Sequence, residues 1–302
     1  MRDPHPAEGD RPGALADVVR IAEVHDKAAR LKAEIDVLNA QRADARNRAA
    51  DKLDSLMSTL DVDAEDAELD RKDPAGFSRT PPVPMTAKYA VRQTAYTPDA
   101  FELTWTEEIS YRGEAGGETY FLVRKLEVPE LENTLPWPVR LTMSNQRQAM
   151  RFEIDQQGKV VDALWHQDGP QRGMRPEMLR PEIEGGLQRR RLYDPGETGT
   201  RGVGETWAGK DVRVLDGRAI PLEYTSKFAA WESVRGVECA RIESKLTGEA
   251  TKGTETVWMH PESSVPVQWR RTMEFPTVDP DGSERKWSEA VQGVLVEVTG
   301  HR

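Results

Sequence analysis

The chain has 302 residues, which allows two domains, and 37% of its residues are hydrophobic while 31% are charged. Its formal net charge of -10 argues against a general affinity for nucleic acid or anionic membranes, because an acidic surface repels phosphate. No apolar run approaches the roughly 18 residues of a transmembrane segment, and a single cysteine excludes an intramolecular disulfide and a zinc site built on cysteines alone.

Residues 1–62 are predicted to form a helical or coiled-coil segment. Neither proline nor glycine occurs between Ala14 and Leu60, and the composition favours helix. Apolar residues at spacings of three and four form an a/d seam. The seam consists of Ile21, Val24, Ala28, Leu31, Ile35 and Leu38. A long helix cannot bury so narrow an apolar stripe by itself. We therefore expect self-association or contact with another helical protein through these six residues.

Two alternatives for this helical segment stay open. The chain can fold back near Asn39–Asn47, where the seam weakens. It can also form one long amphipathic helix that lies on its own β-domain.

Residues 63–86 are predicted to form a linker. The stretch Asp61–Asp66 is acidic, and Arg79–Pro84 is rich in proline. Few apolar groups are available here for packing, so this composition predicts an extended, stiff spacer.

Residues 87–302 are predicted to form an antiparallel β-domain. After Met85 the apolar period changes from near 3.5 to 2, which is typical of strands with one buried face. Counting the alternating segments gives about ten strands. They are Tyr89–Ala95, Phe101–Tyr111, Tyr120–Leu126, Met150–Ile154, Val161–Trp165, Ile220–Ala230, Val237–Ile242, Val257–Met259, Val265–Trp269 and Val294–Val298. Short connections marked by glycine or proline favour antiparallel pairing.

The apolar face of this sheet must be covered. Arg175–Arg190 can supply a short helix for that purpose, although its prolines and glycines leave an irregular segment open. The predicted fold class is therefore α+β: a predominantly antiparallel, curved sheet in the form of a half-barrel around short helices, with the long N-terminal helix or coiled coil.

Three segments carry a resemblance to a known class of proteins. They are Gly202–Trp207 (GVGETW), Gly236–Ile242 (GVECARI) and the hairpin Phe152–Val160. These segments resemble motifs of uncharacterised bacterial families similar to the LolA-like half-barrels, which include periplasmic lipoprotein carriers and related lipid-binding envelope proteins. The resemblance covers about residues 85–300. It implies a half-barrel in the cell envelope if a signal was removed. If the chain is complete as written, the lack of an export signal predicts a cytoplasmic protein instead.

No catalytic, cofactor or metal site is predicted. Gly204–Lys210 matches GxxxxGK formally, but Asp211 follows where a phosphate-binding loop needs Ser or Thr, so we expect a turn before a strand. Cys239 lies within a predicted strand, so we expect a buried structural thiol rather than a nucleophile. The histidines have no zinc-ligand spacing.

Two features remain as candidate binding groups. Arg189–Arg191 is the one basic cluster, and we expect it to pair with nearby acids such as Asp194 and Glu197. Aromatic residues supply a candidate apolar ligand face, and Trp137 between two prolines is expected to be a core plug. The candidate face consists of Trp105, Trp137, Phe152 and Trp165.

The sequence thus favours a non-enzymatic binding or assembly protein. Its β-domain would hold a lipid or other hydrophobic ligand or act as an interaction scaffold, with the N-terminal helix mediating self-association. The alternative is a purely structural subunit of a larger complex, and an enzyme whose site is not visible in the sequence comes third.

Overall fold

The structure is a computed structural model of the whole chain. The residues that it describes are 27, 30–34, 36–37, 67–70, 81, 83–97, 101–113, 119–127, 149–165, 175–192, 200–215, 218–278 and 282–300. The chain divides into two compact units, Met1–Ala45 and Arg46–Arg302. Within the described part, no helix is long and apolar enough to cross a membrane.

The described residues of the first unit are helical and exposed. Leu31 of the predicted seam is 49% exposed. The other five seam residues, Ile21, Val24, Ala28, Ile35 and Leu38, lie outside the described residues. The described residues therefore do not support a long coiled coil, and the proposed helical interface stays a prediction.

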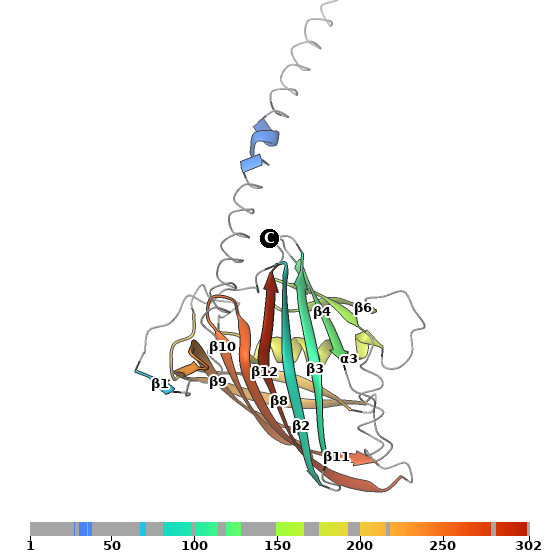
Figure 1. Cartoon of the computed structure of the whole chain (residues 1–302). Helices are drawn as coiled ribbons and strands as arrows, with labels where there is room; N and C mark the ends of the chain where they lie inside the picture. The colour runs from blue at the N-terminus through green and yellow to red at the C-terminus, as the bar shows by residue number, and fades with distance from the viewer. Residues whose placement is uncertain are drawn as a thin grey trace, which may run out of the picture. The chain divides into compact units, whose positions relative to one another are not determined.

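In its described residues, the second unit is built on one 12-stranded antiparallel sheet (Figure 1). Its strands are β1 (Ala67–Leu69), β2 (Met85–Thr97), β3 (Phe101–Arg112), β4 (Thr119–Glu127), β5 (Met150–Asp155), β6 (Val160–Trp165), β7 (Thr206–Leu215), β8 (Arg218–Val234), β9 (Val237–Thr247), β10 (Lys252–His260), β11 (Val265–Val278) and β12 (Glu284–Gly300). The predicted linker therefore contains β1 and the start of β2. The predicted antiparallel sheet is confirmed.

The sheet consists of two meanders joined in its middle. Strands β7 to β12 pair in chain order, and so do β2 to β6. The last strand, β12, pairs with β2, so that Leu295 lies opposite Tyr89. The short strand β1 pairs with β8. Segments from the two ends of this unit therefore lie side by side at the centre of the sheet.

Helix α3 (Pro176–Arg189) packs against strands near both edges of the sheet. It follows β6 and precedes β7 in the chain, and it packs against both strands as well as against β5 and β8. Figure 1 shows α3 on the hollow side of the curved sheet. Pro176 occupies the first turn, where its missing N–H costs no helical hydrogen bond. Of the two possibilities left open for Arg175–Arg190, the structure thus shows the helix rather than an irregular segment.

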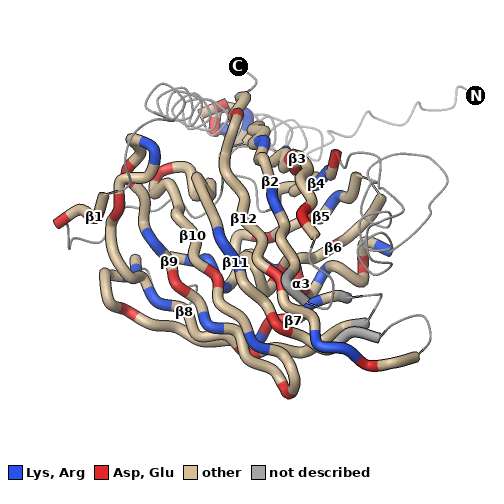
Figure 2. Tube along the Cα trace, turned by 60° about the horizontal axis from the view of Figure 1, so that its bottom comes forward, with Lys and Arg blue, Asp and Glu red and all other residues tan. Residues whose placement is uncertain are grey.

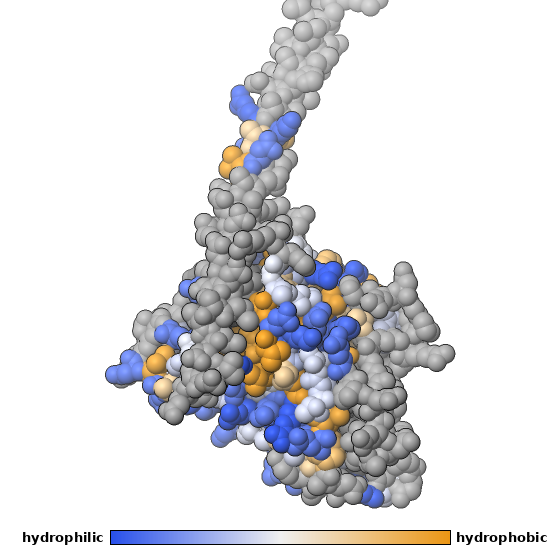
Figure 3. All heavy atoms as spheres, viewed as in Figure 1, coloured by the Kyte–Doolittle hydropathy of each residue, from blue (hydrophilic) through white to orange (hydrophobic). Residues whose placement is uncertain are grey.

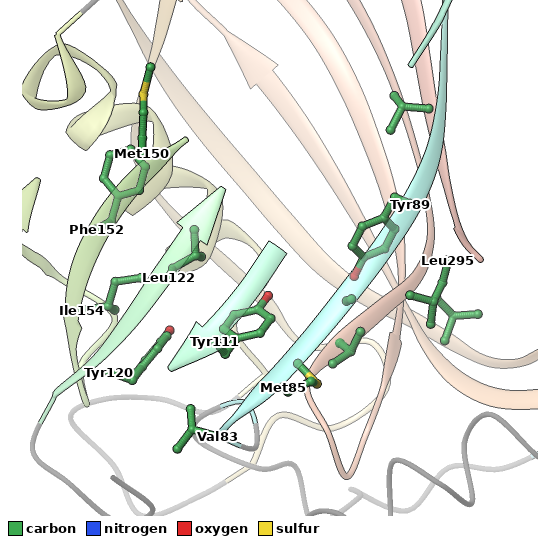
Figure 4. Close-up of a cluster of buried hydrophobic side chains, with 14 of the residues drawn as sticks. Val83, Met85, Tyr89, Tyr111, Tyr120, Leu122, Met150, Phe152, Ile154 and Leu295 are labelled. Atoms are coloured by element: carbon green, nitrogen blue, oxygen red, sulfur yellow. The ribbon is translucent and has the colours of Figure 1, made fainter. Parts of the chain in front are cut away.

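The inner face of the sheet carries two apolar clusters. The first draws mainly on β2 to β6 and includes Tyr89, Phe152 and Leu295 (Figure 4). The second draws mainly on β7 to β12 and includes Trp231 and Phe228. On the strands as a whole, Lys and Arg are interspersed with Asp and Glu (Figure 2). In Figure 3, apolar side chains gather in patches among polar ones.

Two predicted inward positions are wrong, and β-bulges explain both. Val296 is 46% exposed while its neighbour Leu295 is fully buried, because the pairing shifts between Leu295 and Glu297. Val161 is 42% exposed while Val160 is buried, because the pairing of β5 with β6 also shifts by one residue. An extra residue in a strand reverses the alternation locally.

Candidate functional site

Charged and amide side chains gather on the inner face of the sheet among the apolar residues. Strand alternation places them there: Glu255 lies two residues before the buried Val257, and Glu289 lies two before the buried Val291. We call this group the polar belt. It consists of Gln93, Glu107, Arg124, Glu182, Arg189, Arg190, Asp211, Arg213, Glu255, Arg271 and Glu289. With five arginines and five carboxylates, its formal charges cancel.

Glu255 is the most buried carboxylate of the polar belt, at 1% exposed. Arg189 donates from Nε to its Oε2 over 2.9 Å, and Arg190 donates from Nη2 to its Oε1 over 2.8 Å. Burial alone would raise the pKa of Glu255, but the two guanidinium groups outweigh it and hold the pKa well below its usual value. Arg189 also pairs with Asp211 of β7. The C-terminal turn of α3 is thus tied to β7 and β10.

A second set of contacts ties the middle of α3 to β7. Glu182 pairs with Arg213 and accepts a hydrogen bond from the Val214 N–H at 2.9 Å. Burial would raise the pKa of Glu182, but the nearby arginines, Arg213 first, lower it. Arg213 also lies 3.8 Å from a carboxylate oxygen of Glu289.

The remaining two carboxylates of the polar belt, Glu289 and Glu107, contact residues of the sheet itself. Glu289 accepts hydrogen bonds from Gln93 at 2.6 Å and from the Trp287 indole at 3.1 Å. Glu107 of β3 pairs with Arg124 of β4 at 2.6 Å. Every carboxylate of the polar belt therefore has an arginine within salt-bridge distance.

Arg271 differs from the other arginines of the polar belt. Within the described part of the chain, its buried Nε has no hydrogen-bond partner, and the guanidinium has no salt bridge. Burial, followed by repulsion from Arg213, lowers the pKa of Arg271 to about 10. Arg213 Nε likewise finds no acceptor among the described residues.

Eight of the eleven residues of the polar belt line a cavity of about 170 Å³ between α3 and the sheet. Its lining combines the charged groups with apolar side chains. The apolar lining consists of Ile109, Leu122, Ile183, Leu187, Val212, Leu222, Leu246, Pro266, Trp269 and Met273. A second cavity of about 100 Å³ shares four lining residues with the first. These are Tyr111, Leu187, Arg190 and Pro266.

Tyr111 lines both cavities, and Tyr89 belongs to the same apolar cluster. In Figure 4 the hydroxyl groups of Tyr89 and Tyr111 are directed toward one another across the cluster. Within the described part, the Tyr89 hydroxyl has no hydrogen-bond partner although it is buried. Burial raises the pKa of Tyr89 well above its usual value and that of Tyr111 to about 12, so both stay neutral at physiological pH.

The structure places the candidate aromatic face in the core rather than around the cavities. Phe152 is fully buried in the first apolar cluster, and Trp165 is half-buried against the same cluster. Trp105 is half-buried and packs against both clusters. None of these three is among the residues that line the two described cavities. Trp137 lies outside the described residues.

The sequence indicates the basic cluster Arg189–Arg191, but it does not indicate the acidic residues that pair with it in the structure. Asp194 and Glu197 lie outside the described residues, and the described partners of Arg189 and Arg190 are Asp211 and Glu255, which are distant in the chain. One signal for the polar belt is present in the sequence: an acidic residue at an inward position of an otherwise amphipathic strand, as at Glu255.

Two further expectations are confirmed. Cys239 is fully buried in β9. The segment after Gly204 leads directly into β7 rather than into a helix, so it is not a phosphate-binding loop. Among the described residues, no group of three or more His, Cys, Asp or Glu side chains is arranged to hold a metal ion.

Comparisons with known proteins assign no family. No protein-family model and no curated protein matches the chain. The structure is distantly similar to a lipovitellin described for its lipid–protein interactions, with 9% identity and a TM-score of 0.30 over 74% of this chain. The match spans only 26% of the lipovitellin chain, so the aligned region is about a quarter of that protein.

Two smaller proteins give similar results. Rv2717c from M. tuberculosis is 8% identical with a TM-score of 0.28 and covers 71% of this chain and 94% of its own. A DUF1329 family protein from Desulfovibrio piger is 7% identical with a TM-score of 0.23 and covers 86% and 93%. Likeness at this level carries no argument about function, and the LolA-like resemblance stays a prediction.

Proposed function

We propose that the β-domain is a binding protein that holds a small, largely apolar molecule between α3 and the curved sheet. The observation that carries the proposal is the cavity of about 170 Å³ inside the sheet, whose wall is apolar except for the polar belt. Ligand sites are typically concave, mostly apolar and marked by a few convergent polar groups. The adjoining cavity of about 100 Å³ gives the ligand additional room.

The polar belt supports binding rather than chemical conversion. A general acid or base works best when its pKa lies near the operating pH. Arginine keeps Glu182 and Glu255 ionised, with their pKa values below the usual range. Arginine itself does not give up its proton in proteins. These groups are therefore suited to holding α3 and a ligand in place.

Filling the cavity tests this proposal. A Cβ at Gly186 would meet no atom within 4 Å, and Gly186 lines the cavity, so Gly186→Leu places a side chain in that space. We expect the wild-type chain to bind octan-1-ol in isothermal titration calorimetry and Gly186→Leu to bind it at least tenfold more weakly. Met178→Leu, at an exposed position of the same helix, serves as the control and should bind like the wild type.

Two outcomes of this experiment would contradict the proposal. A wild-type chain that binds no apolar probe would exclude a ligand site in the cavity. Equal binding by the wild type and by a folded Gly186→Leu would place the bound molecule elsewhere.

Self-association through the N-terminal helix is a separate proposal. Leu31 is an apolar seam residue that is exposed in the described helical part. A mass by light scattering that rises with concentration in the wild type, and stays monomeric in Leu31→Asp, would support it. A monomer at all concentrations would contradict it.

A further inference from the structure

The cavity wall is more positive than the polar belt as a whole. Three carboxylates line the cavity, namely Glu107, Glu182 and Asp211, whereas all five arginines of the polar belt line it. The other two carboxylates, Glu255 and Glu289, are nearly completely buried and do not line it. A molecule in the cavity therefore meets an excess of guanidinium groups.

Most acceptors within the polar belt are already occupied; among the described residues, Oε1 of Glu289 and Nε of Arg271 are two buried atoms of the belt that have no hydrogen-bond partner. Glu255 accepts from Arg189 and Arg190, Asp211 pairs with Arg189, and Glu182 pairs with Arg213. Glu107 pairs with Arg124. Arg271 lines the same cavity and, among the described residues, its Nε has no acceptor. A buried N–H group of a charged side chain is costly when it has no acceptor, and an anion in the cavity would supply one.

Arg213, on strand β7, also indicates that the cavity binds an anion. It lines the cavity from β7, and its Nε also lacks an acceptor within the described part. Burial lowers the pKa of Arg271 most, and repulsion from Arg213 lowers it further. A negative oxygen that both residues can reach would relieve this repulsion and satisfy the two N–H groups.

We infer, on the basis of the binding function proposed above, that the ligand is a monoanionic carboxylic acid whose carboxylate is held by Arg271 and Arg213. Its apolar part lies against Leu187 and Trp269, on the apolar wall of the same cavity. A planar carboxylate matches the fork of a guanidinium group. A single negative charge fits better than two, because the charges of the complete polar belt cancel and each further buried charge is costly.

Octanoate and octan-1-ol have apolar chains of similar length, so a comparison of their affinities measures the contribution of the carboxylate. We expect octanoate to bind the wild-type chain about tenfold or more tightly than octan-1-ol at pH 7 in calorimetry, because hydrogen bonds to charged groups are stronger than neutral ones. Octyl phosphate, which carries more than one charge at this pH, should bind more weakly than octanoate.

Substitution of Arg271 provides the test of the residue. Arg271→Gln should lose the preference for octanoate while it retains binding of octan-1-ol. The adjacent Arg270→Gln should behave like the wild type, because Arg270 is exposed and stacks on Trp258 instead of lining the cavity. If Arg271→Gln does not fold, Arg271→Lys keeps the charge without the fork, and its preference for octanoate should be reduced.

The outcomes separate the two proposals. Binding of octan-1-ol as tight as that of octanoate, or an unchanged preference in folded Arg271→Gln and Arg271→Lys, would overturn the carboxylate site and leave the binding function standing. Tighter binding of octyl phosphate would overturn the monoanion. Failure of every probe to bind the wild type would overturn both proposals.

Discussion

At the scale of single residues, we expect Glu255 to contribute more to the stability of the folded chain than any other carboxylate of the polar belt. It is almost fully buried and accepts hydrogen bonds from two arginines of α3. Removal of its charge leaves both arginines buried with fewer partners. We expect Glu255→Gln to lower the free energy of unfolding by about 3–5 kcal/mol in urea denaturation.

An exposed glutamate provides the control for this substitution. Glu223 lies on the outer face of β8, and Glu223→Gln should change the free energy of unfolding by less than about 0.5 kcal/mol. Equal effects of the two substitutions would mean that the buried pairs contribute nothing to stability.

The same carboxylate makes stability depend on pH. The pKa of Glu255 is lowered in the folded chain from the ordinary value of 4.5, so its contribution is complete above that value and is lost as the pH falls through the folded pKa. We expect the free energy of unfolding to decrease from about pH 5 to pH 2, and Glu255→Gln to show a shallower decrease. Parallel curves for the two proteins would contradict this assignment.

Residue spacing predicts burial better than it predicts partners. The alternation of β10 and β12 shows that Glu255 and Glu289 lie on the inner face. Nothing in local spacing indicates that Arg189 bonds to Glu255, because the two are 66 residues apart and meet only when α3 packs on the sheet. The acids next to the arginine cluster in the chain were therefore the expected partners.

At the scale of elements, adjacent glycines of α3 have opposite roles. A Cβ at Gly185 would collide with Asp211 of β7, 2.7 Å from its Cγ, whereas a Cβ at Gly186 would meet nothing within 4 Å. Gly186→Ala should stabilise the chain by up to about 1 kcal/mol through helix propensity. Gly185→Ala should destabilise it, because Asp211 must move away from Arg189. Thermal unfolding of both variants checks this, and similar shifts would show that α3 does not pack closely on β7.

The bulge in β12 gives a second matched pair. Leu295 is fully buried and Val296 is half-exposed. Leu295→Ala should cost about 2–5 kcal/mol, and Val296→Ala should have little effect, both measured by urea denaturation. The reverse order would restore the alternation expected from Val294, Val296 and Val298.

Simple alternation predicts the strand itself but not the inserted residue, because a bulge leaves the apolar pattern almost unchanged.

At the scale of the whole molecule, the sequence predicts the antiparallel sheet and offers a short helix as its cover, but it does not locate the cavity. One apolar face per strand requires a cover, and Arg175–Arg190 supplied it. The pairing of β12 with β2 joins distant segments, and the space beside α3 depends on how the two meanders curve together. Of the aromatic residues expected to contact a ligand, Phe152 is fully buried in the first apolar cluster, and the candidate ligand face stays a prediction.

A crystal structure of the chain soaked with octanoate tests the central claim most directly. We expect one octanoate between α3 and the sheet, with its carboxylate within hydrogen-bond distance of Nε of Arg271 and Arg213 and its chain against Leu187 and Trp269. An empty cavity at saturating octanoate, or octanoate bound only on the outer face of the sheet, would contradict it.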